Sequence, residues 1–323
     1  MALSDMIVYS DLIVTATMEA YTEQAEAFNA ASGGTIVLDS QAMQGDFRQE
    51  SMFAKIDSSA FRRVDRYASN DAVAATQLSQ IEDVVVKIAS GYGPVEFEPS
   101  QMTYLQKNPE EAIANISRTL AEAILDDQLN MAIGAGVAAI GNVAALTNDI
   151  SATAGISQSA LNNTHALFGD ASMRLTAQVM NGATYHKLIG EALTNTNTLF
   201  QAGNVTIVNI LNKRVIVTDS PSLYLSGTPN KAYVLNLVVG AIIVSDSGDL
   251  IVNIETSNGS QRLVTSFQSD STYTMGLKGY AWDITNGGKS PLDAEILTGS
   301  NWDLYVSDNK NTAGALLISD ADL

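Results

Sequence analysis

The most informative stretch of the chain is "NPEEAIANISRTLAEAILDDQLNMAIGAGVAAIG", residues 108–141. It begins with Asn108, a good helix N-cap, and with Pro109, which suits the first helical position. Apolar side chains then recur at helical spacing and form one stripe: Ile113, Ile116, Leu120, Ala123, Ile124 and Met131. This pattern predicts a long amphipathic helix of about seven turns, from residue 109 to about residue 135.

The polar face of this predicted helix carries most of its charge. The residues opposite the apolar stripe are Glu111, Asn115, Arg118, Glu122 and Asp126. Asp127 interrupts the stripe, and because an unpaired buried carboxylate is costly we expect Asp127 to be exposed or paired with a cation. Gly134, Gly136 and Gly141 do not form a dinucleotide-binding fingerprint, and we interpret them as the loosening end of the helix.

Helical and strand patterns alternate through the rest of the chain, which predicts an α+β fold. Met18, Ala25 and Phe28 recur at helical spacing and predict a helix that ends near Gly33 and Gly34. The other expected elements are strands at 35–40, 84–88 and 173–180, helices at 157–168 and 182–193, two short strands around Asn212 and Lys213, and a mostly β region from 231 to 285.

Basic residues are concentrated in one stretch of an otherwise acidic chain. The formal net charge is −18, yet "GDFRQESMFAKIDSSAFRRVDRY", residues 45–67, holds five of the 17 Lys and Arg residues. They are Arg48, Lys55, Arg62, Arg63 and Arg66. So acidic a chain is a poor binder of the nucleic-acid backbone, although it could enclose nucleic acid behind a repulsive inner wall. No apolar run is long enough to predict a membrane span.

The sequence contains no recognisable active-site motif. The chain has no Cys, which excludes disulfides and thiol catalysis, and His165 and His186 are its only histidines. No nucleophile elbow or metal-binding motif accompanies either histidine, so we interpret both as structural. We therefore expect no enzyme activity, cofactor or metal. A soluble hydrolase, with a site assembled around these histidines from distant residues, is the alternative from a different class.

Several stretches, in their order along the chain, resemble the major capsid proteins of tailed bacteriophages. The resemblance covers essentially the whole chain and rests on the set rather than on any one motif. The stretches are "MALSDMIVYSD", "AFNAASGGTIVL", "GDFRQESMFAKI", "RRVDRYAS", "FEPSQMTYLQKNPEEAI", "DDQLNMAI", "QVMNGATYHKLIG", "NVTIVNILNKRVIVTDSP", "GDLIVNIETSNGSQRL", "GLKGYAWDITNGGKSP", "NWD" and "KNTAGAL".

The resemblance implies the tailed-phage major capsid fold, an α+β fold with four parts. These are an N-terminal arm (1–38), an extended hairpin called the E-loop (39–77), a peripheral domain with a long spine helix and a long β-sheet (78–156 and 235–290), and an axial α/β domain (157–234 and 291–323). The helix from Pro109 would be the spine helix. Strands between 233 and 283 would supply part of the peripheral sheet.

The family also implies a function. Its members are structural proteins that self-assemble into hexamers and pentamers, forming the icosahedral or elongated phage head around double-stranded DNA. Such a protein is made in the bacterial host cytoplasm and ends in the virion, with a portal, decoration proteins and a separate scaffolding protein as possible partners. An encapsulin-type shell around an enzyme cargo is the alternative with the same fold.

In this family the E-loop projects from its own subunit and lies over a neighbour, which gives the basic stretch a role. A projecting hairpin has little core of its own, so its stability must come from intersubunit contact. The candidate contacts are Arg48, Phe53, Lys55, Arg62, Arg63 and Arg66 on the E-loop, and Glu111, Glu122 and Asp126 on the spine helix. The competing interpretation is a solvated surface loop, since isolated surface ion pairs contribute only about 0–1 kcal/mol each.

Overall fold

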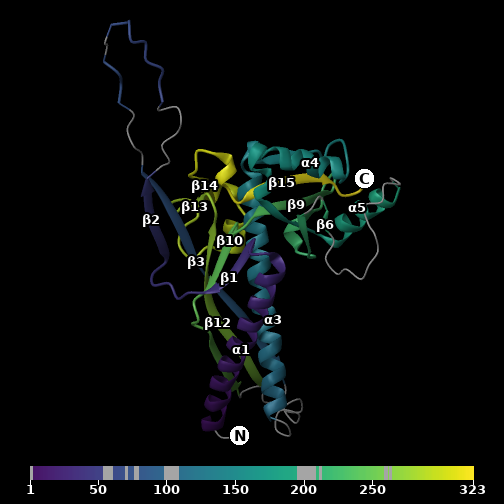
Figure 1. Cartoon of the computed structure of the whole chain (residues 1–323). Coiled ribbons are helices and arrows are strands. Elements are labelled where there is room, and N and C mark those ends of the chain that lie inside the picture. The colour runs from purple at the N-terminus through teal and green to yellow at the C-terminus, as the bar shows by residue number, and fades with distance from the viewer. Residues whose placement is uncertain are drawn as a thin grey trace.

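The computed structural model describes residues 3–53, 61–69, 72–75, 80–97, 109–194, 209–210, 213–257, 261 and 264–323. These residues form a long shaft and a broader head (Figure 1). Helices α1 (Leu3–Ser32) and α3 (Pro109–Gly141) run along the shaft beside strands of one sheet. Helices α4 (Gln158–Ala166) and α5 (Gly182–Thr194) lie in the head with a second sheet.

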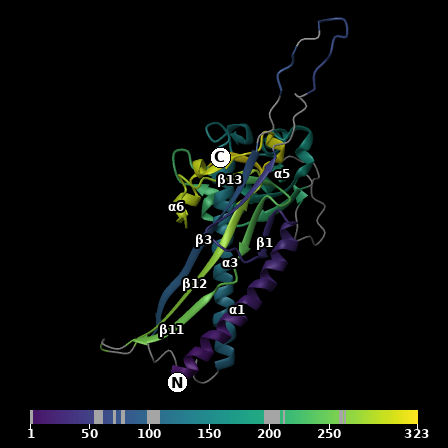
Figure 2. The same ribbon diagram turned by 90° about the vertical axis from the view of Figure 1, so that its left-hand side faces the viewer.

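The sheet along the shaft, sheet A, has eight strands. They are β1 (Ile36–Ser40), β2 (Phe47–Phe53), β3 (Gln80–Phe97), β10 (Ile242–Asp246), β11 (Ile251–Ser257), β12 (Val264–Leu277), β13 (Tyr280–Trp282) and β14 (Trp302–Leu304). Strand β12 is central and pairs antiparallel with β3, β10, β11 and β13. Strand β1 pairs in parallel with β10, Ile36 lying opposite Ile242, and the other described pairings of this sheet are antiparallel. The long β3 and β12 give the shaft its length (Figure 2).

The second sheet, sheet B, has seven strands and lies in the head. They are β4 (Thr147–Asp149), β5 (Leu175–Met180), β6 (Asn209–Ile210), β7 (Lys213–Val217), β8 (Tyr224–Leu225), β9 (Lys231–Val238) and β15 (Gly314–Asp320). The order is β4-β15-β9-β5-β7-β6, with β8 beside β9. Strands between 233 and 283 were expected to supply part of the long sheet; β10 to β13 do lie in sheet A, whereas β9 pairs with β15 and β5 in sheet B.

Helix α3 confirms the predicted long helix but continues to Gly141. The glycines that we interpreted as a loosening helix end instead lie where α3 packs closely. A Cβ atom on Gly134 would lie 2.3 Å from Leu297 Cδ2, and one on Gly136 would lie 3.1 Å from Ile242 Cδ1. The cost of glycine within a helix is therefore offset by close packing, which leaves the helix intact.

A polar contact joins the two helices between a small apolar cluster near the N-terminus and the main apolar core, which continues into the head. Helix α1 runs beside α3 in the same direction, and Ile13 and Leu120 belong to the cluster nearer the N-terminus. Further along, the Tyr21 hydroxyl donates to Gln128 Oε1 at 2.6 Å, and Gln128 Nε2 donates to Asp246 Oδ2 at 3.3 Å. This contact therefore joins α1, α3 and β10 in one hydrogen-bond chain. Burial raises the pKa of the Asp246 carboxyl.

The C-terminal end of α1 is held by a cation from the head. Arg214 Nη1 on β7 donates to the carbonyl oxygens of Ala30 and Ala31, at 3.2 and 3.3 Å. Gly33 follows with φ +69°, and a Cβ atom there would lie 3.0 Å from Arg214 Nη1. A cation at this position pairs with carbonyls that a helix end leaves free and with the negative end of its dipole.

Replacing Arg214 by Ala should lower the free energy of unfolding by about 1 kcal/mol, because the last turn of α1 loses its capping cation. Urea unfolding of the unassembled subunit, followed by circular dichroism, measures this change. The matched control is Lys278→Ala, an exposed cation whose ammonium donates to a loop carbonyl, that of Val239, and caps no helix among the described residues. Equal stability of Arg214→Ala and the unchanged chain would contradict the capping role.

Candidate intersubunit contact site

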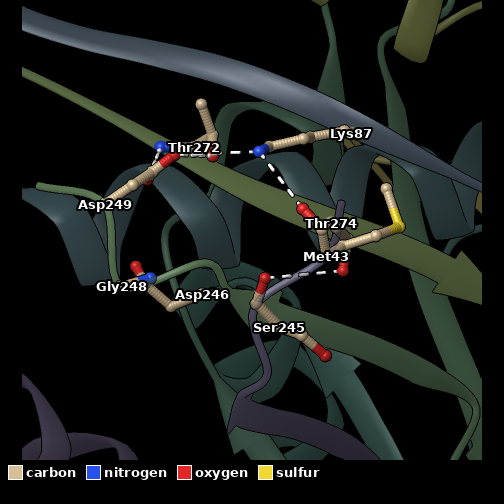
Figure 3. A network of polar contacts seen from close by, with 8 residues as sticks. All are labelled: Met43, Lys87, Ser245, Asp246, Gly248, Asp249, Thr272 and Thr274. Carbon is tan, nitrogen blue, oxygen red and sulfur yellow. Dashed lines mark hydrogen bonds and ion pairs between the residues drawn. The ribbon is translucent and has the colours of Figure 1, made fainter. Parts of the chain in front are cut away.

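Strands β2 and β3 pair antiparallel as a hairpin, and a polar cluster lies at its root, where the chain enters β2 (Figure 3). Lys87 Nζ on β3 lies 3.7 Å from Asp249 Oδ2 and 3.5 Å from the carbonyl oxygen of Met43, which precedes β2. Asp249 also accepts from the Thr272 hydroxyl at 2.5 Å and from its backbone N–H at 2.8 Å. Lys87 therefore ties the chain that enters the hairpin to sheet A.

Two further ion pairs lie near this root. Lys289 Nζ is 3.5 Å from Asp46 Oδ2, one residue before β2. On β2 itself, Arg48 Nε lies 3.4 Å from Glu50 Oε1 of the same strand. Arg48 was predicted to contact a neighbouring subunit, and it already has a carboxylate partner in its own strand.

Beyond the root, the described residues 61–69 and 72–75 project far from the body of the molecule (Figures 1 and 2). All of them are exposed, and Phe61 and Tyr67 have 89% and 99% of their surface accessible. Asp65 Oδ1 accepts from the Tyr67 backbone N–H at 2.9 Å, which shapes a local turn. We call residues 61–69 the tip segment.

The tip segment combines apolar and basic side chains. Phe61, Val64 and Tyr67 are large, apolar and exposed. Arg62, Arg63 and Arg66 lie between them, and no described carboxylate forms an ion pair with these three arginines. Exposed apolar groups and unpaired cations on a segment without a core are typical of a surface that binds another molecule.

The side chains of three predicted contact residues, Phe53, Lys55 and Glu111, lie outside the described part of the structure. Lys55 lies outside the described residues. Phe53 is the last residue of β2, and Glu111 lies in the first turn of α3, while the side chains of both lie outside the description.

The predicted acceptor face on α3 is only partly free. Glu122 Oε1 accepts from Arg118 Nε at 3.0 Å, an (i, i+4) pair on the helix surface. Asp126 is exposed and has no ion-pair partner among the described residues. Asp127 was expected to be exposed or paired with a cation, and it is exposed. Its Oδ2 accepts a hydrogen bond from the Ser90 hydroxyl at 2.9 Å. Partial burial raises the pKa of the Asp127 carboxyl, the Ser90 bond opposes this rise, and the nearby Asp293 carboxylate adds to it.

The two histidines lie in different surroundings. His165 is buried in the head, where its Nε2 lies 2.9 Å from Asn236 Oδ1 and 3.1 Å from Gln178 Nε2. His186 is exposed on α5 and makes a ring contact with Tyr185. Within the described residues, no group of three or more His, Asp or Glu side chains could hold a metal ion. These surroundings match a structural role for His165.

Acid should destabilise the subunit partly through His165. Burial lowers the pKa of the His165 imidazole below its ordinary value of 6.5. As the pH falls through and below 6.5, the unfolded chain therefore binds a proton at His165 more readily than the folded chain, and the free energy of unfolding decreases. We expect His165→Gln to reduce the fall in Tm between pH 7.5 and pH 5 by about 2 °C or more. His186→Gln is the exposed control, and an equal effect of both changes would contradict this assignment.

Comparison with known proteins establishes the family. A sequence model of the Gp13-like family, described as "Major capsid protein 13-like", matches residues 5–316. The chain belongs to this family. It is therefore a shell-forming major capsid protein, as the resemblance implied, and the family places it in the virion. Comparison with curated protein sequences gives no match.

Solved structures show the same fold. A chain of the cyanophage Pam1 capsid asymmetric unit is 13% identical, with a TM-score of 0.51 and 86% of each chain covered. A chain of the head of Helicobacter pylori bacteriophage KHP40 is 11% identical, with a TM-score of 0.50 over 89% of this capsid protein and 88% of the phage chain. At such low sequence identity these structural matches show the fold alone. They confirm the predicted tailed-phage capsid fold. Among the described helices, none is long and apolar enough to span a membrane.

Sequence reasoning did not find every residue that shapes this region. Lys87 was treated only as part of a strand, and the corner around helix α6 (Asp293–Ile296) was not singled out. The available signal was an isolated lysine among β-branched residues at 84–88, which indicates a polar partner on one face of the strand.

Proposed function

We propose that this capsid protein assembles into hexamers and pentamers that close the phage head, with the tip segment of each subunit bound to the next subunit. The observation that carries the proposal is the exposure of Phe61 and Tyr67, at 89% and 99%, on a segment far from any core of its own. Exposure of these aromatic side chains to water does not stabilise the free subunit. Assembly of subunits can bury them against a neighbour.

In this contact, burial of the two aromatic side chains contributes more free energy than the ion pairs do. Moving a large apolar side chain from water into a contact contributes about 1.5–3 kcal/mol, whereas one exposed ion pair contributes about 0–1 kcal/mol. We assign affinity to Phe61 and Tyr67, and choice of partner and register to Arg62, Arg63 and Arg66. The same small contact recurs at every subunit of the shell.

The two sheets support a division into peripheral and axial domains, with boundaries that follow the strands. Sheet A with α1 and α3 would form the peripheral domain with its N-terminal arm. Sheet B with α4 and α5 would form the axial domain. Because β4 and β9 lie in sheet B and β14 in sheet A, we propose boundaries near residues 146, 239 and 305 in place of 156, 234 and 290.

We further propose that the shell encloses double-stranded DNA without binding it specifically. A net charge of −18 would keep the packaged polyanion from adhering to the inner wall. Portal, decoration and scaffolding proteins are the partners that a head of this kind would need, and the host cytoplasm is where the chain would be made.

The contents of purified particles test this proposal. Particles from an infected host should hold nuclease-resistant double-stranded DNA. Particles that hold no nucleic acid but a single enriched enzyme would favour the encapsulin-type alternative instead.

A further inference from the structure

The corner formed by α6 and α3 presents two exposed leucines on a firmly held support. Leu292 and Leu297 flank α6 and are 72% and 42% exposed. Two side-chain hydrogen bonds hold the backbone of α6. Trp302 Nε1 donates to the carbonyl oxygen of Ile296 at 2.9 Å, and Asn301 Nδ2 donates to the carbonyl oxygen of Glu295 at 2.9 Å. The isolated subunit therefore leaves two large apolar side chains exposed beside one short, hydrogen-bonded helix.

The rim of this corner is acidic. Asp293 and Glu295 lie on α6 itself, and both are exposed. Across from α6, Asp126 and Asp127 lie on α3, where the Asp293 carboxylate is close enough to contribute to the raised pKa of Asp127. None of these four carboxylates forms an ion pair with a lysine or arginine that the structure describes. The corner thus carries two exposed leucines and four carboxylates that have no ion-pair partner among the described residues.

The tip segment is the chemical complement of this corner. It carries exposed apolar side chains between three arginines, whereas the corner carries exposed leucines between aspartates. Glu122, another of the predicted acceptors, already forms an ion pair with Arg118 at 3.0 Å. The charge pattern of the described surface therefore favours the α6 corner over the α3 face near Glu122 as the acceptor.

The positions of the two surfaces favour contact between copies. In Figure 2 the tip segment leaves the head at one side, and α6 lies at the other side of the head. A subunit therefore does not cover its own corner. Two complementary surfaces at different places on one chain give a head-to-tail interface, and such an interface closes into a ring when the rotation between copies allows it.

We propose that the tip segment of one subunit docks on the α6 corner of a second copy, with Tyr67 and Val64 against Leu292 and Leu297 and the arginines against Asp126 and Asp293. This inference rests on the proposed function, since it names the acceptor for the same tip segment. It differs from that function in a testable way, because shells could form with the tip segment bound elsewhere.

Chemical cross-linking tests the docking, and the chain is well suited because it has no cysteine of its own. Two variants carry paired cysteines, Tyr67→Cys with Leu292→Cys and Val64→Cys with Leu297→Cys. The matched control is Tyr67→Cys with Ile251→Cys, since Ile251 is 67% exposed on β11, away from the corner. Assembled particles are treated with a short bis-maleimide and then analysed by denaturing electrophoresis.

We expect a ladder of covalent oligomers from at least one of the two corner pairs, several-fold stronger than from the control pair or from Tyr67→Cys alone. Particles that assemble but give no ladder above the control for both pairs would overturn the docking and leave the capsid function intact. Failure of the unchanged chain to form particles under any condition would instead contradict the proposed function. If one double-cysteine variant does not assemble, cross-linking of the other variant still tests the docking.

Discussion

Changing Arg62, Arg63 and Arg66 together to Glu should abolish closed shells. All three side chains are exposed on the tip segment and pair with no described carboxylate, so the folded subunit does not depend on them. If each cation contributes up to about 1 kcal/mol to the contact, their loss weakens it about 100-fold, and the new like-charge repulsion weakens it further. Particle yield by sedimentation and negative-stain electron microscopy measures the effect.

Two controls separate charge from folding in this experiment. The triple change to Lys keeps the charge and should give near-normal yield at low salt, with greater sensitivity to added salt because Lys lacks the planar fork of Arg. Circular dichroism of the unassembled Glu variant should match that of the unchanged subunit. Shells of normal yield and salt tolerance from the Glu variant would show that the tip arginines are a solvated surface.

Replacing Trp302 by Ala should lower the free energy of unfolding of the subunit by about 3–5 kcal/mol. Trp302 is 2% exposed and packs edge-to-face on Trp282, with ring centroids 4.9 Å apart and planes at 73°. Its indole N–H also holds the carbonyl oxygen of Ile296, so the change frees α6 as well as opening a cavity. Urea unfolding of the unassembled subunit measures the loss.

The comparison for Trp302 is Tyr224→Ala, a partly exposed aromatic on the edge strand β8. Tyr224 is 45% exposed, so its truncation should cost much less. An unfolding midpoint of Trp302→Ala within error of the unchanged subunit would contradict the packing described for the two tryptophans. A large loss from Trp302→Ala would also predict fewer assembled particles at high temperature.

Local signals predicted the helices well because caps and periodicity are local properties. Asn108, Pro109 and the apolar stripe located α3, and the spacing of Met18, Ala25 and Phe28 located α1. The end of α3 was placed too early because the glycines there are explained by tertiary packing. Leu297, more than 160 residues away in sequence, lies where a side chain on Gly134 would be. Nothing local records that contact.

Strand partners were harder to predict than strands. Strands between 233 and 283 were expected to supply part of the long sheet, and β9, at the start of this range, lies instead between β15 and β5 in the head. Periodicity indicates which face of a strand is buried, but it does not specify which distant strand supplies the hydrogen bonds. The parallel pairing of β1 with β10 is another contact that only the assembled fold reveals.

The candidate site was predictable on one side of the contact and not on the other. A cluster of five cations in a chain of net charge −18 marks the hairpin directly in the sequence. The proposed acceptor, the α6 corner, gives no comparable signal, because the exposure of Leu292 and Leu297 depends on how Trp302 and Asn301 hold α6. Sequence alone therefore favoured the regular acidic face of α3, where Glu122 is already paired with Arg118.

Electron microscopy of the purified protein, expressed alone and then with the neighbouring phage genes, is the decisive test of shell assembly through the tip segment. We expect hexamers, pentamers, tubes or closed shells, and in a reconstruction the tip segment of each subunit should lie against the next subunit. A monodisperse monomer or dimer under every condition, scaffolding protein included, would contradict it.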